Sequence, residues 1–399
     1  MLFIISLLIQ FFTLWAIFFF GLSRNAGAIT TIIVAVVTAF ISPWSLLASI
    51  PLILLSVIVM VDSLRMTFIT KPAYKMLANA MPSMSSTERE ALEAGTSWWE
   101  KDLFMGAPDW SKFESYPYPV LSDEEQSFLN NEVEQLCSML NDWEIGHNYK
   151  DLPPEAWTYI RDNGFLGLII PKEYGGREFS SFAQSRIMSK IASRSLTAAV
   201  SCMVPNSLGP GELLLHYGTE EQKNRYLPGL AKGKEIPCFG LTSPEAGSDA
   251  GSIPDTGVVC YGEFDGRQVL GLRMNFSKRW ITLAPIATVI GLAFKLYDPE
   301  GLLGDKSKME YGITCALIPA SHEGVKVGPR HNPGVPFMNG TVDGKDVFIP
   351  LDWIIGGRKN IGKGWRMLME CLSVGRGISL PALSTAASEM TYLNVGAFA

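Results

Sequence analysis

The sequence predicts an α+β protein whose soluble part follows a membrane segment. Nearly every charged residue lies beyond Val61, which separates an apolar N-terminus from an ordinary globular chain. Helical periodicity up to residue 235 then gives way to sequence rich in Val, Ile, Tyr and Phe, and it returns near residue 356. A chain of 399 residues is also too long for one typical core, so two or more compact units are expected.

We therefore predict five consecutive segments. Residues 1–62 form a transmembrane segment of two or three helices, and residues 63–120 form a linker with a tryptophan-rich helix. Residues 121–235 form a helical domain, residues 236–355 a β domain, and residues 356–399 the start of a second helical domain.

Composition excludes several classes of function. A net charge of −6 argues against a nucleic-acid-binding protein, which usually presents a basic face. The six cysteines are widely spaced without a CxxC pair, which fits reduced cytosolic thiols better than a disulfide framework. The histidines lack metal-ligand spacing, so we expect no metal site; they are His147, His216, His322 and His331.

The apolar N-terminus carries a single charge, Arg24. Residues 2–22 form an apolar run long enough to cross a bilayer, which takes about 20 residues. A cleaved signal peptide is the alternative, because residues 26–28 resemble a cleavage site, but no Lys or Arg precedes the run. Residues 26–61 form a second uncharged stretch, interrupted by prolines, that is either a two-helix hairpin or one kinked span.

The positions of the basic residues favour three crossings over two. Three crossings place Arg24 on the same side of the membrane as Arg65, Lys71 and Lys75, as the positive-inside rule prefers. Two crossings separate them. We therefore expect the anchor to lie in the inner membrane, with the soluble part facing the cytoplasm.

Start signals mark the helices of the first soluble domain. Ser122 with Glu125 forms a predicted capping box ahead of apolar residues at helical spacing, and Thr219 with Gln222 forms a second one. Between these two signals, a single long helix is predicted over residues 180–203.

Two motifs in the β domain offer groups suited to binding a polar ring edge or a phosphate. LTSPEAGSD, at residues 241–249, follows an apolar run and supplies hydroxyl groups and backbone amides in a Gly/Ser/Thr loop. KRWIT, at residues 278–282, places a flat Trp side chain near a Thr in a predicted strand. Taken singly, such motifs are more often a turn and a packed strand residue.

In this order the two motifs resemble the flavin-contacting signatures of the acyl-CoA dehydrogenase family. The resemblance extends to GFLGLIIPKEYGG at residues 164–176, to residues 206–249, and to NIGKGWRMLMECLSVGRG at residues 360–377. It covers roughly residue 121 to the end of the chain. The hydrophobic N-terminus and the Trp-rich linker further resemble the long, membrane-associated bacterial members of the family that act in fatty-acid β-oxidation.

The resemblance implies a fold and a reaction. The fold is an N-terminal helical domain, a central β domain and a C-terminal four-helix bundle, with FAD bound between domains. The reaction is α,β-dehydrogenation of an acyl-CoA thioester, here a long-chain one, to the trans-2-enoyl-CoA. A carboxylate removes the α-proton while the β-hydride passes to flavin N5, and an electron-transferring flavoprotein accepts the electrons. The resemblance also implies a homo-oligomer for the full-length protein.

Carried over residue by residue, the resemblance implies a flavin site. Trp280 lies against the isoalloxazine ring, with Ile281 and Thr282 beside it and the Thr282 hydrogen bond near flavin N5. Ser248 also approaches the pantetheine arm of the substrate, and Arg376 belongs to the substrate site. The loop residues that contact the flavin or its ribityl chain are Phe239, Leu241, Thr242, Gly247 and Ser248.

The chain departs from the family pattern at two positions. The family usually has Glu where Ser243 stands. One branch carries its catalytic Glu directly before the position of Arg376, but Gly375 occupies that place, and Glu370, six residues before Arg376, is expected to be a solvated helix residue. We expect the base to lie beyond Ala399, together with the rest of the bundle, so that the 399-residue chain alone is inactive.

Two other functions stay open on the sequence alone. An acyl-CoA oxidase uses the same fold and similar motifs but passes electrons to oxygen, although a membrane segment fits an electron-chain partner better. A non-catalytic acyl-CoA-binding or assembly module would keep the fold without the base.

An unfinished bundle further predicts that the apolar faces of residues 365–372 and 378–383 have no partners.

Overall fold

The computed structural model divides the chain into two compact units, Met1–Ser85 and Ser86–Ala399. The structure describes residues 2–80, 89, 92–93, 98–106, 108–207, 209–372 and 375–398. The predicted linker helix, from Ser86 onward, falls largely outside these residues.

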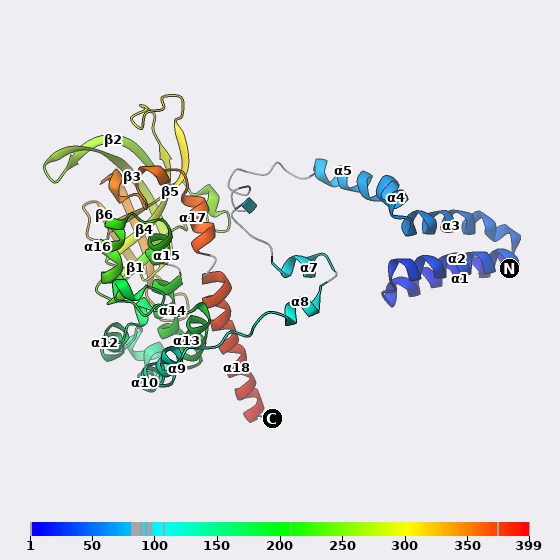
Figure 1. The fold of residues 1–399 in the computed structure, drawn as a ribbon, viewed down its shortest axis with the longest axis horizontal. Coiled ribbons are helices and arrows are strands. Elements are labelled where there is room, and N and C mark those ends of the chain that lie inside the picture. The colour runs from blue at the N-terminus through cyan, green and yellow to red at the C-terminus, as the bar shows by residue number, and fades with distance from the viewer. Residues whose placement is uncertain are drawn as a thin grey trace. The chain divides into compact units, whose positions relative to one another are not determined.

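The N-terminal unit contains three apolar helices, each long enough to cross a membrane (Figure 1). Helix α1 spans Leu2–Phe19, α2 spans Arg24–Ile41, and α3 spans Leu46–Met60 after a 3₁₀ turn at Pro43–Ser45. At 1.5 Å per residue, a span of 18 residues rises about 27 Å, close to the thickness of the hydrocarbon core. The second uncharged stretch is therefore two helices and not one kinked span.

A buried polar cluster joins all three helices. The side-chain amide of Gln10 on α1 donates hydrogen bonds to Thr38 Oγ1 on α2 at 2.6 Å and to Ser49 Oγ on α3 at 2.8 Å. The three side chains are at most 4% exposed. Because an amide without partners is costly in an apolar medium, this cluster specifies which helix faces meet.

Charged side chains gather at one end of this unit. Arg24, at the start of α2, pairs with Asp62, just after α3, at 2.9 Å, and Arg65 reaches the same carboxylate at 2.9 Å. Three antiparallel helices bring these charges to one end. Helix α4 (Asp62–Arg65), a π-helical turn (Met66–Thr70) and α5 (Lys71–Ala80) follow without a break.

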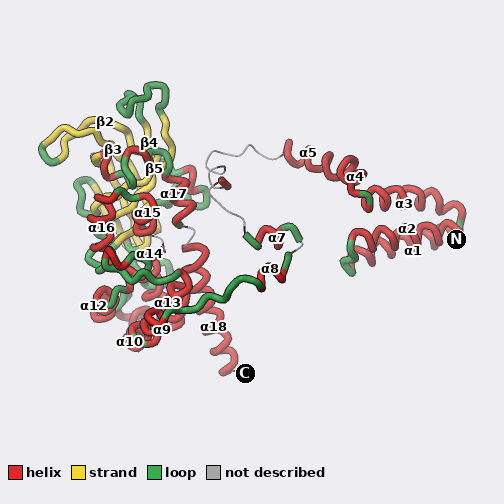
Figure 2. Tube along the Cα trace, in the orientation of Figure 1, coloured by secondary structure: helices red, strands yellow, loops and turns green. Residues whose placement is uncertain are grey.

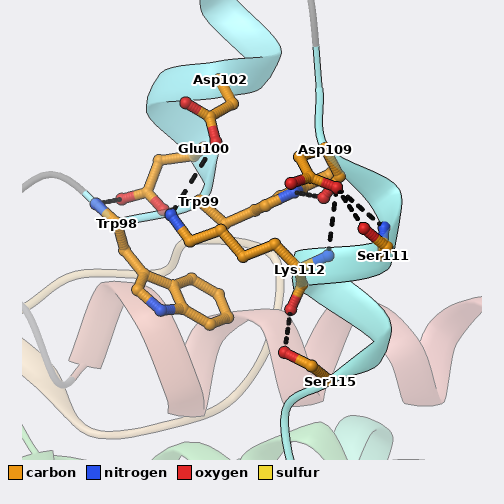
Figure 3. A network of polar contacts seen from close by, with 8 residues as sticks. All are labelled: Trp98, Trp99, Glu100, Asp102, Asp109, Ser111, Lys112 and Ser115. Carbon is orange, nitrogen blue, oxygen red and sulfur yellow. Dashed lines mark hydrogen bonds and ion pairs between the residues drawn. The ribbon is translucent and has the colours of Figure 1, made fainter.

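The second unit begins with an aromatic cluster on two short helices, α7 (Glu100–Phe104) and α8 (Trp110–Glu114). The Trp99 ring packs on Trp110 and Phe113, with centroids 5.0 and 4.7 Å apart, and its indole N–H donates to the Asp109 carbonyl at 2.8 Å. The Asp109 carboxylate caps α8 (Figure 3). Trp99, which is 8% exposed, therefore serves packing in this cluster.

The helical domain confirms both predicted capping boxes, at Ser122 and at Thr219. The single helix predicted over residues 180–203 is wrong. Ser195 is extended, at φ −151° and ψ 117°, and its N–H closes the first of two separate helices. The helices are α9 (Asp123–Asn130), α10 (Glu132–Met139), α11 (Asp142–Glu144), α12 (Pro154–Asp162), α13 (Ser181–Arg194), α14 (Leu196–Ser207), α15 (Pro210–Tyr217) and α16 (Glu220–Ala231).

The β domain is one seven-stranded sheet in the order β1-β4-β2-β3-β7-β6, with β5 paired to the other side of β4. Strands β1 and β2 run parallel to β4, and the remaining pairs are antiparallel. The strands gather at one end of this unit and helices α9, α10, α12 and α13 at the other (Figure 2). The strands are β1 (Pro237–Gly240), β2 (Thr256–Phe264), β3 (Arg267–Thr282), β4 (Val289–Tyr297), β5 (Glu310–Pro319), β6 (Val325–Arg330) and β7 (Asn339–Pro350).

The last helices have partners, contrary to the expectation for residues 365–372 and 378–383. On α17 (Gly364–Cys371), Met367 and Leu368 are buried, and the helix packs on α15 and β5. Helix α18 (Leu380–Phe398) packs its first turns on α13 and buries Ala382. Contacts with the preceding domains therefore bury part of the apolar face of each of these two helices.

Deleting residues 1–61 should move the protein from the membrane fraction to the soluble fraction, because these residues hold the three apolar helices. Immunoblots of both fractions after a high-salt wash provide the measurement, since salt removes ionic attachments and leaves buried apolar contacts. The intact chain, treated in parallel, should stay with the membranes. Sedimentation of the shortened form after the wash would contradict the assignment of an anchor.

Candidate functional site

The first motif lies in a loop that leaves the edge of the sheet. Strand β1 ends at Gly240, opposite Leu292 on β4, and β2 begins at Thr256, opposite Lys295 on the same edge of β4. Residues 241–255 connect these two points. The LTSPEAGSD sequence therefore lies in the connection between two strands that pair with the same side of β4, and it is not itself part of a strand.

A buried charge anchors this loop to β3. Lys278 Nζ lies 2.5 Å from Asp255 Oδ2, and the two side chains are 0% and 1% exposed. The same ammonium donates to the Leu241 carbonyl at 2.9 Å and to Ser243 Oγ at 3.1 Å, so each of its three N–H bonds has an acceptor. Burial lowers the pKa of Lys278, while the charge of Asp255 and the hydrogen bond to it act in the opposite direction.

Backbone hydrogen bonds strengthen this attachment. The Arg279 amide donates to the Thr242 carbonyl at 3.1 Å, and the Ser277 amide donates to Asp255 Oδ1 at 2.9 Å. Within the loop, Ser243 and Ala246 exchange N–H to carbonyl hydrogen bonds at 3.2 Å. The two motifs that the sequence analysis paired are therefore directly joined.

Trp280 sits on a β-bulge. Lys278 pairs with Val342 on β7, but Ile281 pairs with Gly340, so β3 carries one extra residue between these positions. Trp280 has φ +58°, which is unusual for a bulky residue, and its side chain is half exposed, whereas Ile281 returns to the core. The bulge thus turns the indole out of the sheet beside the anchored loop.

A chain of polar residues lies next to this indole. The His331 ring packs against Trp280 with centroids 4.2 Å apart, and its Nδ1 lies 2.9 Å from Asn339 Oδ1. Asn339, which pairs with Thr282 across the sheet, donates to Thr282 Oγ1 at 3.4 Å. Sequence reasoning missed His331 and Asn339, because their positions depend on strand register, for which the sequence carries no local signal.

The loop presents hydrogen-bond donors to its surroundings. Gly247 and Ser248 are exposed, and within the described residues their amides and the Ser248 hydroxyl have no hydrogen-bond partner. A Cβ added at Gly247 would meet no atom within 4 Å. Phe239, Leu241 and Thr242 are half-buried at the base of the loop. Free donors beside an outward aromatic face are what a flavin ring and its ribityl chain require.

Of the two residues predicted for the substrate site, Ser248 lies in this loop and Arg376 lies on another element. Arg376 is exposed on the π-helical turn Gly375–Ser379, and in the described part of the chain no side-chain contact links it to the loop or to Trp280.

Glu370 is not the solvated residue that the sequence predicted. It is half-buried, accepts a hydrogen bond from the Tyr217 hydroxyl, and pairs with Arg366 at 2.8 Å. The contact with Tyr217 attaches α17 to the end of α15, whereas Arg366 lies one turn earlier on α17 itself.

This fold and the paired motifs define a class of flavin-dependent oxidoreductases. Residues 121–234 match the acyl-CoA dehydrogenase N-terminal domain, and residues 238–347 match the acyl-CoA dehydrogenase middle domain. The chain belongs to the acyl-CoA dehydrogenase family. Members of this family bind FAD, so the prediction of FAD as the cofactor is confirmed.

Curated relatives extend the comparison. A stretch of 106 residues is 58% identical to Protein HemX of Proteus mirabilis and covers 26% of this chain and 61% of that protein. The very long-chain specific acyl-CoA dehydrogenase of Homo sapiens is 26% identical over 75% of this chain and 44% of its own length. Subunit CarC of the caffeyl-CoA reductase-Etf complex of Acetobacterium woodii is 32% identical over 57% of this chain and 55% of its own length. The chain thus spans less than two thirds of each of these relatives.

A solved structure confirms the predicted fold class. Butyryl-CoA dehydrogenase from Megasphaera elsdenii superposes with a TM-score of 0.57, at 21% identity, over 69% of this chain and 68% of the other. The shared arrangement is a helical domain followed by a curled sheet domain.

Proposed function

We propose that this protein is a membrane-attached acyl-CoA dehydrogenase of fatty-acid β-oxidation. It removes the α-proton and the β-hydride of a long-chain acyl-CoA to form the trans-2-enoyl-CoA. The observation that carries this proposal is the direct attachment of the donor-bearing loop to β3, two residues before the outward face of Trp280.

Bound FAD supplies the hydride acceptor for this reaction. We assign the ring-stacking role to Trp280 and a hydrogen bond near flavin N5 to Thr282. Donors near the ring stabilise the negative charge that develops there during hydride transfer, and apolar walls exclude water. The other proposed flavin contacts are Phe239, Leu241, Thr242, Gly247, Ser248 and Ile281.

The substrate side is proposed from Ser248 and Arg376, with Ser248 next to the pantetheine arm. A carboxylate within hydrogen-bond reach of the α-carbon is also needed. Gly375 has no side chain to provide it. Glu370 is held by Tyr217 and Arg366, so we assign it to positioning α17 and not to proton removal.

The proposed partners follow from the relatives and from the N-terminal unit. CarC is named as a subunit of a complex with Etf, which supports an electron-transferring flavoprotein as the electron acceptor. The human relative is named for very long acyl chains, and a membrane anchor suits such substrates. Arg24, Arg65, Lys71 and Lys75 support an inner-membrane protein with its catalytic part in the cytoplasm. We also propose that the full-length protein forms a homo-oligomer.

Trp280→Ala should raise the dissociation constant of FAD about tenfold, equivalent to about 1.4 kcal/mol, because it removes the stacking face. Thr282→Val should instead slow flavin reduction by acyl-CoA about tenfold and leave FAD bound, because it removes one hydrogen-bonding hydroxyl. Flavin fluorescence titration and stopped-flow absorbance provide the two measurements.

The matched control is Trp143→Ala. Trp143 is also exposed and also stacks on a histidine, His147, with centroids 3.6 Å apart, but it lies in the helical domain. This variant should retain FAD like the unaltered protein. Equal FAD affinity in the Trp280 and Trp143 variants would contradict the proposed stacking role.

In a longer form of the protein that carries the catalytic carboxylate, anaerobic addition of a long-chain acyl-CoA to the FAD-loaded protein should bleach the flavin and reduce an artificial electron acceptor, whereas residues 1–399 expressed alone should do neither. Glu370→Gln should leave this rate within about twofold, because Glu370 has no proposed part in proton removal. Rapid peroxide formation in air would favour an oxidase. Binding of FAD and acyl-CoA without bleaching would favour a non-catalytic module.

A further inference from the structure

The buried Lys278–Asp255 pair has a particular relation to the first motif. Asp255 lies at the far end of the connecting loop, next to the start of β2, and its carboxylate also accepts the Ser277 amide and the Ser243 hydroxyl. Ser243 and Asp255 are 12 positions apart in the sequence. One ammonium therefore holds both ends of the loop, through Leu241 and Ser243 at one end and Asp255 at the other.

The family resemblance described in the sequence analysis implies Glu at position 243, where this chain has Ser. The Ser243 side chain is fully buried, and its Oγ is 3.1 Å from Lys278 Nζ and in contact with the Asp255 carboxylate. A carboxylate on either residue would therefore reach the same ammonium. A second acid at position 243 would place two like charges beside one buried cation, which is unfavourable.

We propose that Asp255 is a positioning residue that supplies, from the other end of the loop, the carboxylate that the family usually carries at position 243. In this role it fixes the donor-bearing loop against β3 and so sets the geometry between Gly247, Ser248 and Trp280. The part of the proposal that concerns FAD rests on the proposed function. The part that concerns the exchange of the carboxylate between positions 243 and 255 does not rest on the proposed function.

Thermal unfolding of the full chain in detergent tests the exchange. Asp255→Ser should lower the unfolding midpoint by about 5–15 °C, because it leaves a buried ammonium without a counter-ion. Adding Ser243→Glu to that variant should recover at least half of the loss. Ser243→Glu alone should destabilise, because it crowds two carboxylates together.

A second pair of substitutions keeps this test decisive if Glu is too long for the site. The double variant Ser243→Asp with Asp255→Ser exchanges the two side chains and conserves their total volume. An unchanged midpoint in Asp255→Ser would overturn the proposal. Failure of both double variants to exceed the midpoint of Asp255→Ser would overturn it as well.

FAD affinity tests the positioning role. Measured well below the unfolding midpoint, Asp255→Ser should bind FAD about tenfold more weakly, and the rescued double variant should bind within about threefold of the unaltered protein. The matched control is Asp298→Ser. Asp298 is equally buried and accepts the Leu302 and Leu303 amides at 2.9 and 2.8 Å, so its loss should lower stability without weakening FAD binding.

Two outcomes separate this proposal from the proposed function. If FAD binding falls equally in Asp255→Ser and Asp298→Ser, the effect is general loss of stability and the positioning role is overturned. If the unaltered protein binds no FAD, the proposed function fails, while the recovery of the midpoint by the double variants still decides whether the carboxylate can be exchanged.

Discussion

The candidate site depends on the burial of one ammonium group. Lys278 occupies an inward position on β3, where a charge without partners would be strongly unfavourable. Its acceptors, on Leu241, Ser243 and Asp255, all belong to the segment between β1 and β2. Satisfying one charge therefore folds this segment onto β3, and it does so two residues before Trp280. Loop and indole are positioned by the same interaction.

The orientation of Trp280 follows from its neighbours. Met274, Phe276 and Lys278 alternate inward along β3, and the next inward residue is Ile281, three positions on and not two. The extra residue leaves the indole outside the sheet with a positive φ. The alternation itself is visible in the sequence, so an inward Lys could have been recognised as a buried cation in need of an acid. The sequence alone does not identify Asp255 as the acid that pairs with this Lys.

Features set by neighbouring residues were predictable, and features set by distant contacts were not. The capping box at Ser122 needs only a residue three positions later, and the sequence predicts it. The helix break at Ser195 coincides with a long-range hydrogen bond from Arg194 to the Leu140 carbonyl, which no local pattern encodes. In the site, the resemblance identified both motifs. The sequence did not predict that His331 and Asn339 belong to the site, because their positions beside Trp280 and Thr282 depend on strand register.

The polar cluster of the N-terminal unit constrains how the chain is made. Gln10 is synthesised first, and Ser49, one of its acceptors, follows 39 positions later. At about 5–20 residues per second, the amide waits roughly 2–8 seconds for this partner. A helix with an unpaired amide is poorly suited to enter lipid alone. For the membrane anchor proposed above, the order of synthesis would thus favour delivery of α1 to the bilayer together with α2 and α3.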